Sequence, residues 1–261
     1  MSNESAVVVR LDAGVLSLTL NRPDKLNAIT YPMINSLLRY LEEAAADPDV
    51  RTVLLRGAGR SFSAGDDLVS MGEVPRALSP GEHPVEAMQQ LLIRRWYWLR
   101  KPTVVAIRGR CHGMAHDLAL AADFRVVSKT AIMGDIRSRR ALPVGSGGTF
   151  LLPWLIGLAA ATKLMLTGDT IDSDEIERLG LASVVVDDDA FDDAVAALAA
   201  RLAAGPTKAL GILKYQMRRS LGSRLEDALE LELSLLDEPV DDRREGRLSF
   251  LEGRAPSFTG R

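Results

Sequence analysis

Two short runs of small residues follow directly on apolar segments, and they constrain the fold more than any other feature of the chain. VRTVLLRG (50–57) is followed by SFSAGDDL (61–68), and PTVVAIRG (102–109) is followed by CHGMAHDLALAA (111–122). Apolar runs of this length that end in glycine are typical of buried strands, and the second small run continues into a helical composition. Repeated alternation of strands with helices predicts an α/β fold.

The segments around these runs continue the alternation. AVVVRL and GVLSLTLN flank a DAG turn, which predicts a hairpin of two strands, and DFRVVS and ASVVVD predict two further strands. TYPMINSLLRYLEEAAADP predicts an amphipathic helix with Thr30 as its N-cap and Pro32 in its first turn. Shorter helices are expected over GGTFLLPWLIG, AAATKLMLTG and DSDEIERLGL. We expect this α/β part to span residues 1–190.

The remainder of the chain has a different pattern. From Phe191 onward it is almost wholly helical, with apolar residues at three- and four-residue spacing. We expect residues 191–261 to form a helical region that packs on its own core or on a neighbouring subunit. Residues 70–90 contain three prolines and few large apolar residues, which predicts a mobile loop over a site.

Composition and charge exclude several classes of protein. The formal net charge of −3 argues against a nucleic-acid-binding surface, which needs a basic excess. No apolar run reaches the roughly 18–20 residues of a membrane span, and no secretory signal pattern is present. A single cysteine, Cys111, and three histidines make a structural zinc site an unfavoured interpretation and fit a reducing cytoplasm. We therefore expect a cytoplasmic protein with no nucleic-acid and no membrane partner.

Both small-residue runs offer backbone N–H groups to a ligand. Ala64 and Gly65 precede an expected helical turn, and Gly113 and Met114 precede the helix expected over 115–122. Amides at a helix N-terminus have no partner within the helix. Two such ends brought together can hold one oxygen between two donors, which is an oxyanion hole. Taken separately, each run is better explained as an ordinary helix start.

Six motifs, in their order and spacing, resemble those of the crotonase, or enoyl-CoA hydratase/isomerase, superfamily over nearly the whole chain. They are NRPDKLNAI, GAGRSFSAGDDL, IRGRCHGMAHDLALAADFRV, LPVGSGGTFLLPWLIG, LMLTGDTIDSDEIERLGLASVVV and FLEGRAPSFTGR. The resemblance implies an α/β spiral of repeated ββα units followed by a C-terminal helical trimerisation region. It also implies an enzyme, a lyase or an isomerase, that acts on an acyl-CoA thioester as a homotrimer or a dimer of trimers. Coenzyme A then enters as part of the substrate, with no redox or metal cofactor.

The resemblance also implies site residues. The backbone N–H groups of Ala64 and Met114 match the donors that stabilise a thioester enolate. Lys25 and Leu26 match a stretch near the adenine and phosphates of CoA. The stretch that matches the wall for the pantetheine arm comprises Ser63, Ala64, Gly65, Asp66, Asp67 and Leu68. The C-terminal residues that match the completion of a CoA pocket, often in a neighbouring subunit, are Phe250, Arg254 and Phe258.

Two positions depart from the hydratase pattern. Hydration needs one carboxylate to activate water and another to deliver a proton, and hydratase relatives carry glutamate at both positions. Asp117 keeps the carboxyl but is one methylene shorter, whereas Arg137 reverses the charge. A guanidinium cannot act as a base near neutral pH. We therefore expect a reaction other than simple two-glutamate hydration.

Several alternatives stay open from the sequence. Asp117 and Arg137 are expected to form an ion pair, in which Arg137 either binds a polar group of an unusual acyl chain beside a catalytic Asp117 or has a structural role. Asp135 could supply another carboxylate. Ser146 lies where isomerase or thioester-hydrolase relatives carry Glu or Asp, which argues against those subclasses. A non-catalytic CoA-ester-binding or assembly subunit of the same fold is the alternative function.

Overall fold

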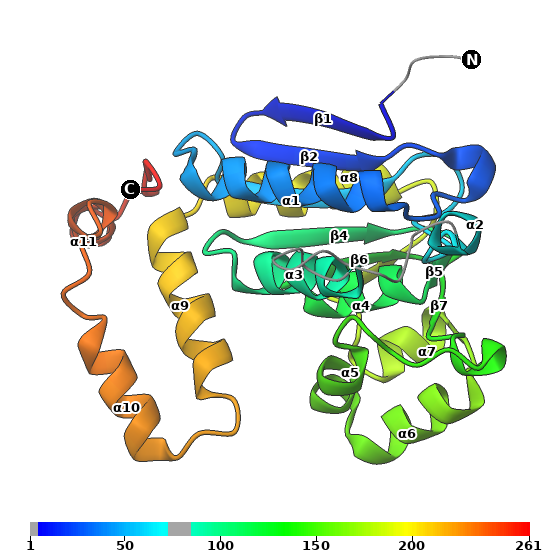
Figure 1. The fold of residues 1–261 in the computed structure, drawn as a ribbon. Coiled ribbons are helices and arrows are strands. Elements are labelled where there is room, and N and C mark those ends of the chain that lie inside the picture. The colour runs from blue at the N-terminus through cyan, green and yellow to red at the C-terminus, as the bar shows by residue number, and fades with distance from the viewer. Residues whose placement is uncertain (1–4, 73–84) are drawn as a thin grey trace, which may run out of the picture.

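A single twisted sheet forms the centre of the molecule (Figure 1). The structure, a computed structural model, describes residues 5–72 and 85–261. The six strands lie in the order β1-β2-β3-β4-β6-β9; β1 and β2 pair antiparallel, as the predicted hairpin requires, and all other neighbours are parallel. Their bounds are Val7–Asp12, Val15–Leu20, Thr52–Gly57, Thr103–Ile107, Phe124–Ser128 and Val184–Val186.

Helices cover both faces of this sheet. The alternating side chains of β3 show this: Val53 and Leu55 enter the larger core, and Leu54 enters a smaller one on the opposite face. The larger core lies under α1, α3 and α4, which span Tyr31–Ala46, Val85–Trp98 and Met114–Ala121. The smaller core is closed by α8 (Phe191–Ala203), so this first helix of the predicted helical region packs on the sheet itself. Coverage of both faces is what parallel strands require.

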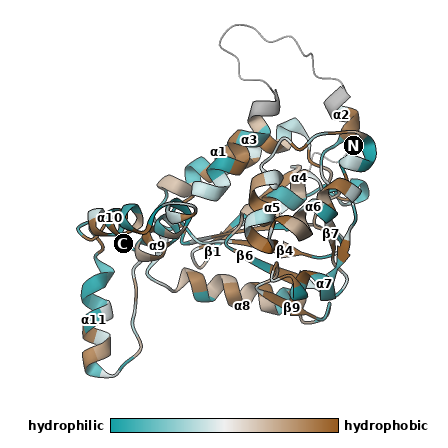
Figure 2. Cartoon of the chain, turned by 90° about the horizontal axis from the view of Figure 1, so that it is seen from below, coloured by the Kyte–Doolittle hydropathy of each residue, from teal (hydrophilic) through white to brown (hydrophobic). Residues whose placement is uncertain are grey.

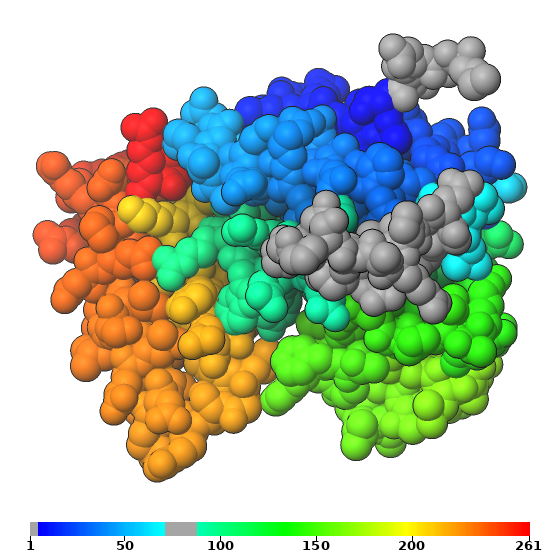
Figure 3. Space-filling model, viewed as in Figure 1, coloured from blue at the N-terminus to red at the C-terminus, as the bar shows by residue number. Residues whose placement is uncertain are grey.

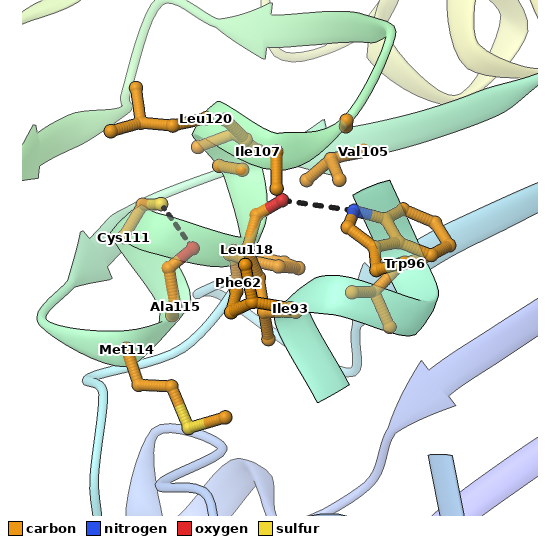
Figure 4. Close-up of a cluster of buried hydrophobic side chains, with 14 of the residues drawn as sticks. Phe62, Ile93, Trp96, Val105, Ile107, Cys111, Met114, Ala115, Leu118 and Leu120 are labelled. Atoms are coloured by element: carbon orange, nitrogen blue, oxygen red, sulfur yellow. Dashed lines mark hydrogen bonds between the residues drawn. The ribbon is translucent and has the colours of Figure 1, made fainter. Parts of the chain in front are cut away.

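Figure 4 shows the part of the larger core next to the second small-residue run. The indole N–H of the fully buried Trp96 donates to the carbonyl oxygen of Leu118 at 3.0 Å, which ties α3 to α4. Cys111 lies beside them and donates through Sγ to the carbonyl oxygen of Ala115 at 3.5 Å. The start of α4 is therefore held by the core on the side away from solvent.

A second, smaller sheet is not predicted from the sequence. Its three strands are β5, β7 and β8, which span Arg110–His112, Ile132–Gly134 and Ile171–Asp172. Each has only two or three residues, which is too short to produce a periodic pattern. The sheet matters for the site because β5 leads directly into α4, and β7 leads into the segment that carries Asp135 and Arg137.

The remaining predicted helices are present. Gly168 ends α6 in the left-handed conformation (φ 69°), and the side chain of Asp172 caps α7 by accepting from the N–H of Glu175. Thr30 lies at the N-cap position of α1, but its side chain makes no capping hydrogen bond. The helices α5, α6 and α7 span Gly148–Ile156, Leu158–Thr167 and Ser173–Arg178.

The loop predicted over residues 70–90 is shorter than expected. The short helix α2 (Leu68–Gly72) covers its beginning, and α3 already starts at Val85. Residues 73–84 lie outside the described part of the chain. The helix α3 begins early because its apolar face, which includes Leu92, Ile93 and Trp96, packs in the larger core.

The last three helices extend away from the sheet (Figures 1 and 2). They are α9, α10 and α11, which span Thr207–Ser220, Leu225–Ser234 and Asp242–Glu252. Figure 3 shows α9 and α10, in orange, separated from the green α5–α6 region by a notch at the lower edge of the molecule. Gly211 of α9 packs directly on the backbone of Arg100, where an added methyl group would lie 2.2 Å from a carbonyl oxygen.

Candidate active site

Backbone hydrogen bonds place the two small-residue runs side by side. The N–H of Phe62 donates to the carbonyl oxygen of Arg108 at 2.7 Å, and the N–H of Ser63 donates to that of Arg110 at 2.9 Å. The N–H of His112 returns a hydrogen bond to the carbonyl oxygen of Ser63 at 3.2 Å. The segment after β3 therefore runs beside β5, and the two runs that the sequence could only suggest to be adjacent do meet.

A buried asparagine holds the neighbouring loop against the first run. Asn27 is fully buried and has a left-handed backbone (φ 54°). Its side-chain amide donates to the carbonyl oxygens of Ala58 and Ser61, both at 2.8 Å, and its side-chain oxygen accepts from the N–H of Arg22 at 2.9 Å. The hydrogen-bonding groups of the Asn27 side chain are thus all satisfied inside the protein.

This loop removes Ala64 as a free donor. The N–H of Ala64 donates to the carbonyl oxygen of Leu26 at 2.9 Å. This corrects the prediction for Ala64, because an amide that is already bonded inside the loop does not point at a ligand. Which amide of the run stays free depends on the carbonyl groups that the neighbouring loop presents, and these are not evident from the run itself.

The free amide of the first run belongs to Asp66. The N–H of Gly65 donates to Oγ of Ser63 at 3.1 Å, and the N–H of Asp67 donates to the carbonyl oxygen of Ile29 at 2.9 Å. Within the part of the chain that the structure describes, the N–H of Asp66 donates to no other residue. Between Phe62 and Asp67, the free amide of the described structure is therefore that of Asp66, two residues later than predicted.

The second free amide is the predicted one. Met114 is the first residue of α4, and its N–H has no backbone acceptor among the described residues. Gly113 precedes it with φ 56° and ψ −125°, a conformation that favours glycine and turns the chain sharply into the helix. The Met114 side chain is fully buried in the larger core, so its amide rather than its side chain is available to the site.

The carboxyl of Asp66 lies where the two amides meet. A methyl group added at Gly113 would be 3.5 Å from Oδ2 of Asp66, and Oδ1 accepts from the side-chain amide of Gln89 at 2.7 Å. Burial raises the pKa of Asp66 above its usual value, against the charge of Arg137 and the backbone N–H donors of Met114 and of Asp66 itself, which lower it. Two amides from separate elements thus face one carboxyl group.

The adjacent aspartate has a different role. Oδ1 of Asp67 accepts from the N–H groups of Val69 and Ser70, both at 3.2 Å, which caps α2 as expected for an acidic residue at a helix start. Its Oδ2 pairs with Arg22 at 2.6 Å, and the hydrogen bond from Arg22 lowers the pKa of Asp67. Leu68, the last residue of the run, is half-exposed at the surface.

Asp117 and Arg137 form the expected ion pair, but within a larger buried cluster. Nη2 of Arg137 lies 2.5 Å from Oδ2 of Asp117 and 2.7 Å from Oδ2 of Asp135. Nε of Arg137 donates to Oδ1 of Asp135 at 2.8 Å, and Nη1 donates to Oγ of Ser146 at 3.0 Å. Ser146 in turn donates to Oδ2 of Asp117. All four side chains are buried.

One cation therefore serves two buried carboxylates. Burial alone would raise the pKa of Asp135, but the hydrogen bonds and charge of Arg137 outweigh it and hold that pKa below its usual value. Burial would lower the pKa of Arg137, and the same two aspartates outweigh it in the opposite direction. Arg137 uses every side-chain nitrogen inside the cluster, so it has little capacity left to bind a polar group of a substrate.

Two histidines lie near the cluster, and His112 adds no positive charge to it at neutral pH. Burial, together with the positive charge of Arg110, lowers the pKa of His112 to about 4. His116 is 2% exposed, and its Nδ1 lies 3.5 Å from Oδ1 of Asp117. Neither of these two atoms has a hydrogen-bond partner among the described residues.

A cavity of about 500 Å³ lies next to the cluster. Its walls come from α3 and from the segment that runs into α5, and they include Ile93, Tyr97, Gly145 and Ser146. A methyl group added at Gly145 would lie 3.7 Å from Oε1 of Gln89, whose side-chain amide donates to Asp66. The cavity therefore adjoins the Arg137 cluster at Ser146, is separated from Asp66 by the side chain of Gln89, and has the size of a small-ligand site.

The residues that the resemblance assigned to CoA do not all gather at this site within one chain. Lys25 is exposed next to the first run, and Leu26 contributes the carbonyl that engages Ala64. Phe250, Arg254 and Phe258 lie on or after α11, at the far end of the molecule from α2 and β5 in Figure 1. Arg254 pairs there with Glu245 at 2.6 Å, and Phe250 is 85% exposed.

Two further features of the described residues concern metal ions and membranes. Within residues 5–72 and 85–261, no three histidine, cysteine or acidic side chains gather in a way that could hold a metal ion. In the same residues, no helix has the length and apolar character needed to cross a membrane.

The buried cluster predicts a pH-dependent loss of stability in Arg137→Met. Removing the cation leaves two buried carboxylates unpaired, and we expect the free energy of unfolding at pH 7 to fall by about 3–5 kcal/mol. The deficit should shrink as the pH falls towards about 4, because protonation of the unpaired carboxylates relieves the variant. Below about 4 it should shrink further, because the native protein then loses the contribution of Asp135, whose folded-state pKa is lowered. Urea unfolding at several pH values measures this.

The matched control is Arg139→Met. Arg139 pairs with Asp169 at 3.0 Å, but both side chains are about half-exposed, so the loss should be below about 1 kcal/mol at every pH. Equal and pH-independent losses in the two variants would contradict the account of the cluster.

Comparison with known proteins identifies the family. The family model described as enoyl-CoA hydratase/isomerase matches residues 10–261. The chain is 34% identical to 1,2-epoxyphenylacetyl-CoA isomerase of Escherichia coli over 258 residues (98% of each chain), and 32% identical to 2,3-dehydroadipyl-CoA hydratase of the same organism over 259 residues (98% of this chain and 100% of that one). The crystal structure of enoyl-CoA hydratase from Bacillus anthracis superimposes with a TM-score of 0.91 at 27% identity, covering 98% of this chain and all of that one. The chain has the crotonase fold and belongs to the enoyl-CoA hydratase/isomerase family.

Proposed function

We propose that this protein is an enzyme that processes an acyl-CoA thioester through an enolate held by the backbone N–H groups of Asp66 and Met114. The observation that carries the proposal is the convergence of these two amides, from two separate elements, on one carboxyl group. A carboxylate oxygen resembles an enolate oxygen in size and charge, so the site that accommodates the first suits the second. Membership of the family supplies the class of substrate.

Differential binding explains why such a site accelerates a reaction. The negative charge on the thioester oxygen grows as a proton leaves the neighbouring carbon, and fixed amides stabilise that charge more than they stabilise the neutral carbonyl. The acyl chain would then occupy the cavity beside Gln89 and Gly145.

The Asp117–Arg137 pair supports a structural interpretation. Oδ2 of Asp117 is occupied by Arg137 and by Ser146, and Arg137 is occupied in turn by Asp135. A pair of free carboxylates for activating water is therefore not what this cluster supplies. We propose that the cluster holds the segment between β7 and α5 against α4, and so fixes the cavity wall.

The CoA part of the substrate is proposed to enter over the first small-residue run. Lys25 lies exposed at that edge, and Gly65 and Asp66 form the wall beside it. Phe250, Arg254 and Phe258 lie too far along the C-terminal arm to reach the site of their own chain (Figure 1). We propose that they act at the site of a neighbouring copy, in a homotrimer or a dimer of trimers.

The surface of the C-terminal arm supports this assembly. Large apolar side chains on α9, α10 and their connection are at least 45% exposed, and in the free chain they form a larger apolar surface than monomers usually present. They are Leu213, Met217, Leu221, Leu225, Leu229 and Leu233.

The assembly can be tested with Leu229→Asp. Wild-type protein should have three or six times the 28.3 kDa mass of one chain in light scattering, and the variant should shift to a smaller species because a buried carboxylate opposes association. Val8→Asp, at an exposed apolar position on β1, is the control and should not change the mass. A wild-type monomer at micromolar concentration would contradict the proposal.

The activity can be tested with a panel of 2-enoyl- and 3-enoyl-CoA thioesters, watched through the absorbance of the conjugated thioester. Turnover of at least one of them supports an enzyme. Tight binding of CoA esters without turnover across the panel would instead support the alternative, a non-catalytic CoA-ester-binding or assembly subunit.

The two-amide site predicts a specific effect of Gly113→Ala. The positive φ of Gly113 is unfavourable for alanine, so the turn before Met114 should shift and carry its N–H out of line. We expect kcat/KM to fall about 100- to 1000-fold, the usual loss when one oxyanion donor is removed. Gly180→Ala is the control: it has φ 71° and open space around it, and should cost stability without a comparable loss of turnover.

A further inference from the structure

Among the described residues, four carboxyl groups lie near the two free amides, and three of them are held by cations. Asp117 and Asp135 share Arg137, and Asp67 pairs with Arg22. The cations lower the pKa of Asp67 and of Asp135, which makes these two poor bases, and Oδ2 of Asp117 is occupied by Arg137 and Ser146. The cluster that resembles an acid/base pair in the sequence is thus the least available source of a base.

The fourth carboxyl, that of Asp66, has different electrostatic surroundings. Asp66 has no cation within salt-bridge distance among the described residues, and its side-chain partner is the neutral amide of Gln89. Its surroundings are largely buried, and they raise its pKa above the usual aspartate value. A carboxyl that is uncompensated by a cation and shielded from solvent is a stronger base than an ordinary aspartate, and is suited to taking up and releasing a proton.

The position of Asp66 also suits a group that transfers a proton on the substrate. Its carboxyl lies at the same two amides that would hold the thioester oxygen, and one of those amides belongs to Asp66 itself. A bound thioester oxygen would accept the hydrogen bonds of both amides, and the Asp66 carboxyl would rotate away from them. Because the side chain is attached to the residue that supplies one donor, it would remain beside the carbonyl group and the carbon next to it.

We propose that the carboxyl of Asp66 is the catalytic acid/base that moves a proton on the acyl chain, with a 3-enoyl thioester as substrate and the 2-enoyl thioester as product. This rests on the proposed function and names the group that forms the enolate. A single free carboxyl suits such a shift, because the same group can remove the proton and return it. Addition of water needs a second group.

The step balances without any co-reactant. The Asp66 carboxylate takes a proton from C2, the C2–H electron pair forms a C1=C2 double bond, and the carbonyl pair moves onto the thioester oxygen between the amides of Asp66 and Met114. When the carbonyl re-forms, the C1=C2 pair shifts to C2=C3, and the former C3=C4 pair takes the proton from Asp66 at C4. The thioester bond stays intact throughout.

This assignment also accounts for Ser146. A serine there argued against an isomerase, because isomerase relatives place a carboxylate at that position. In this structure Ser146 is committed to Arg137 and Asp117. Asp66 is connected to the same cavity by Gln89, which donates to Asp66 and lies beside the lining residue Gly145. A carboxyl from a different element is therefore present one side chain away from the cavity wall.

The test compares wild type with Asp66→Asn on 3-hexenoyl-CoA, followed by the rise in conjugated thioester absorbance. The amide keeps the shape of the side chain but cannot take up a proton, so kcat should fall at least about 100-fold while KM changes little. Asp66→Glu should recover part of the activity. Asp12→Asn, an exposed carboxylate on β1, is the charge-matched control and should leave kcat unchanged.

The pH profile separates proton transfer from a structural effect. Since the base form starts the reaction, wild-type kcat should rise with pH through the pKa of Asp66 and then level off, and the residual rate of Asp66→Asn should lack that rise. Among the described residues, the charged groups that act on Asp66 are Arg137 and Asp117. His116 and Asp135 contact those two in turn, His112 lies next to Gly65, and Asp67 follows Asp66 and pairs with Arg22. Asp117→Asn should therefore retain the rise.

The outcomes distinguish the two proposals. Wild-type isomerisation with Asp66→Asn within about threefold of it, or with the pH rise unchanged, would overturn the role of Asp66 and leave the proposed function standing. Hydration of a 2-enoyl-CoA that survives Asp66→Asn would overturn it as well. A wild type that neither binds nor converts any thioester of the panel would overturn both.

Discussion

The site depends on a few backbone hydrogen bonds between residues 62–63 and 108–112. They run between two chain segments that leave neighbouring parallel strands, β3 and β4, and they set the first small-residue run beside β5. On the other side of the run, the side-chain amide of the buried Asn27 donates to the carbonyl oxygens of Ala58 and Ser61. With these contacts in place, the amides of Asp66 and Met114 bond to no backbone carbonyl of the described residues and face a common point.

Charge distribution then decides which groups of the site can react. One guanidinium, that of Arg137, is enclosed by two carboxylates and a serine, and such a buried set is stable only while every member is paired. In the proposed mechanism Asp117 and Asp135 therefore do not transfer protons, and Asp66, whose hydrogen-bond donors are neutral, does. On this proposal, a family member can lack the second hydratase acid and still hold an enolate.

Sequence patterns predict much of this fold, because the strands of the central sheet and the longer helices have enough residues for their periodicity to show. Strands of two or three residues, such as β5 and β7, have no such signal, although they position Met114 and Arg137. The Asp117–Arg137 pair is predictable from opposite charges at matched positions. The participation of Asp135 and Ser146 depends on how the chain turns after β7.

The error at Ala64 has a similar physical origin. Ala64 and Asp66 lie two residues apart in a run of small residues, and either amide could be free. Leu26 determines which of the two amides is free. Its left-handed backbone (φ 49°) is part of the turn that presents its carbonyl oxygen to the N–H of Ala64. A glycine next to an aspartate could have drawn attention to Asp66, but only the tertiary contact identifies its amide as the free one.

The central claim is that a thioester oxygen binds between the amides of Asp66 and Met114. A crystal structure of the protein with a bound, unreactive acyl-CoA thioester tests it most directly. The account predicts the carbonyl oxygen within about 3 Å of both nitrogen atoms, with the Asp66 carboxyl displaced from them towards the acyl chain. A thioester oxygen bonded to the Ala64 amide, or one held by side chains away from both Asp66 and Met114, would contradict it.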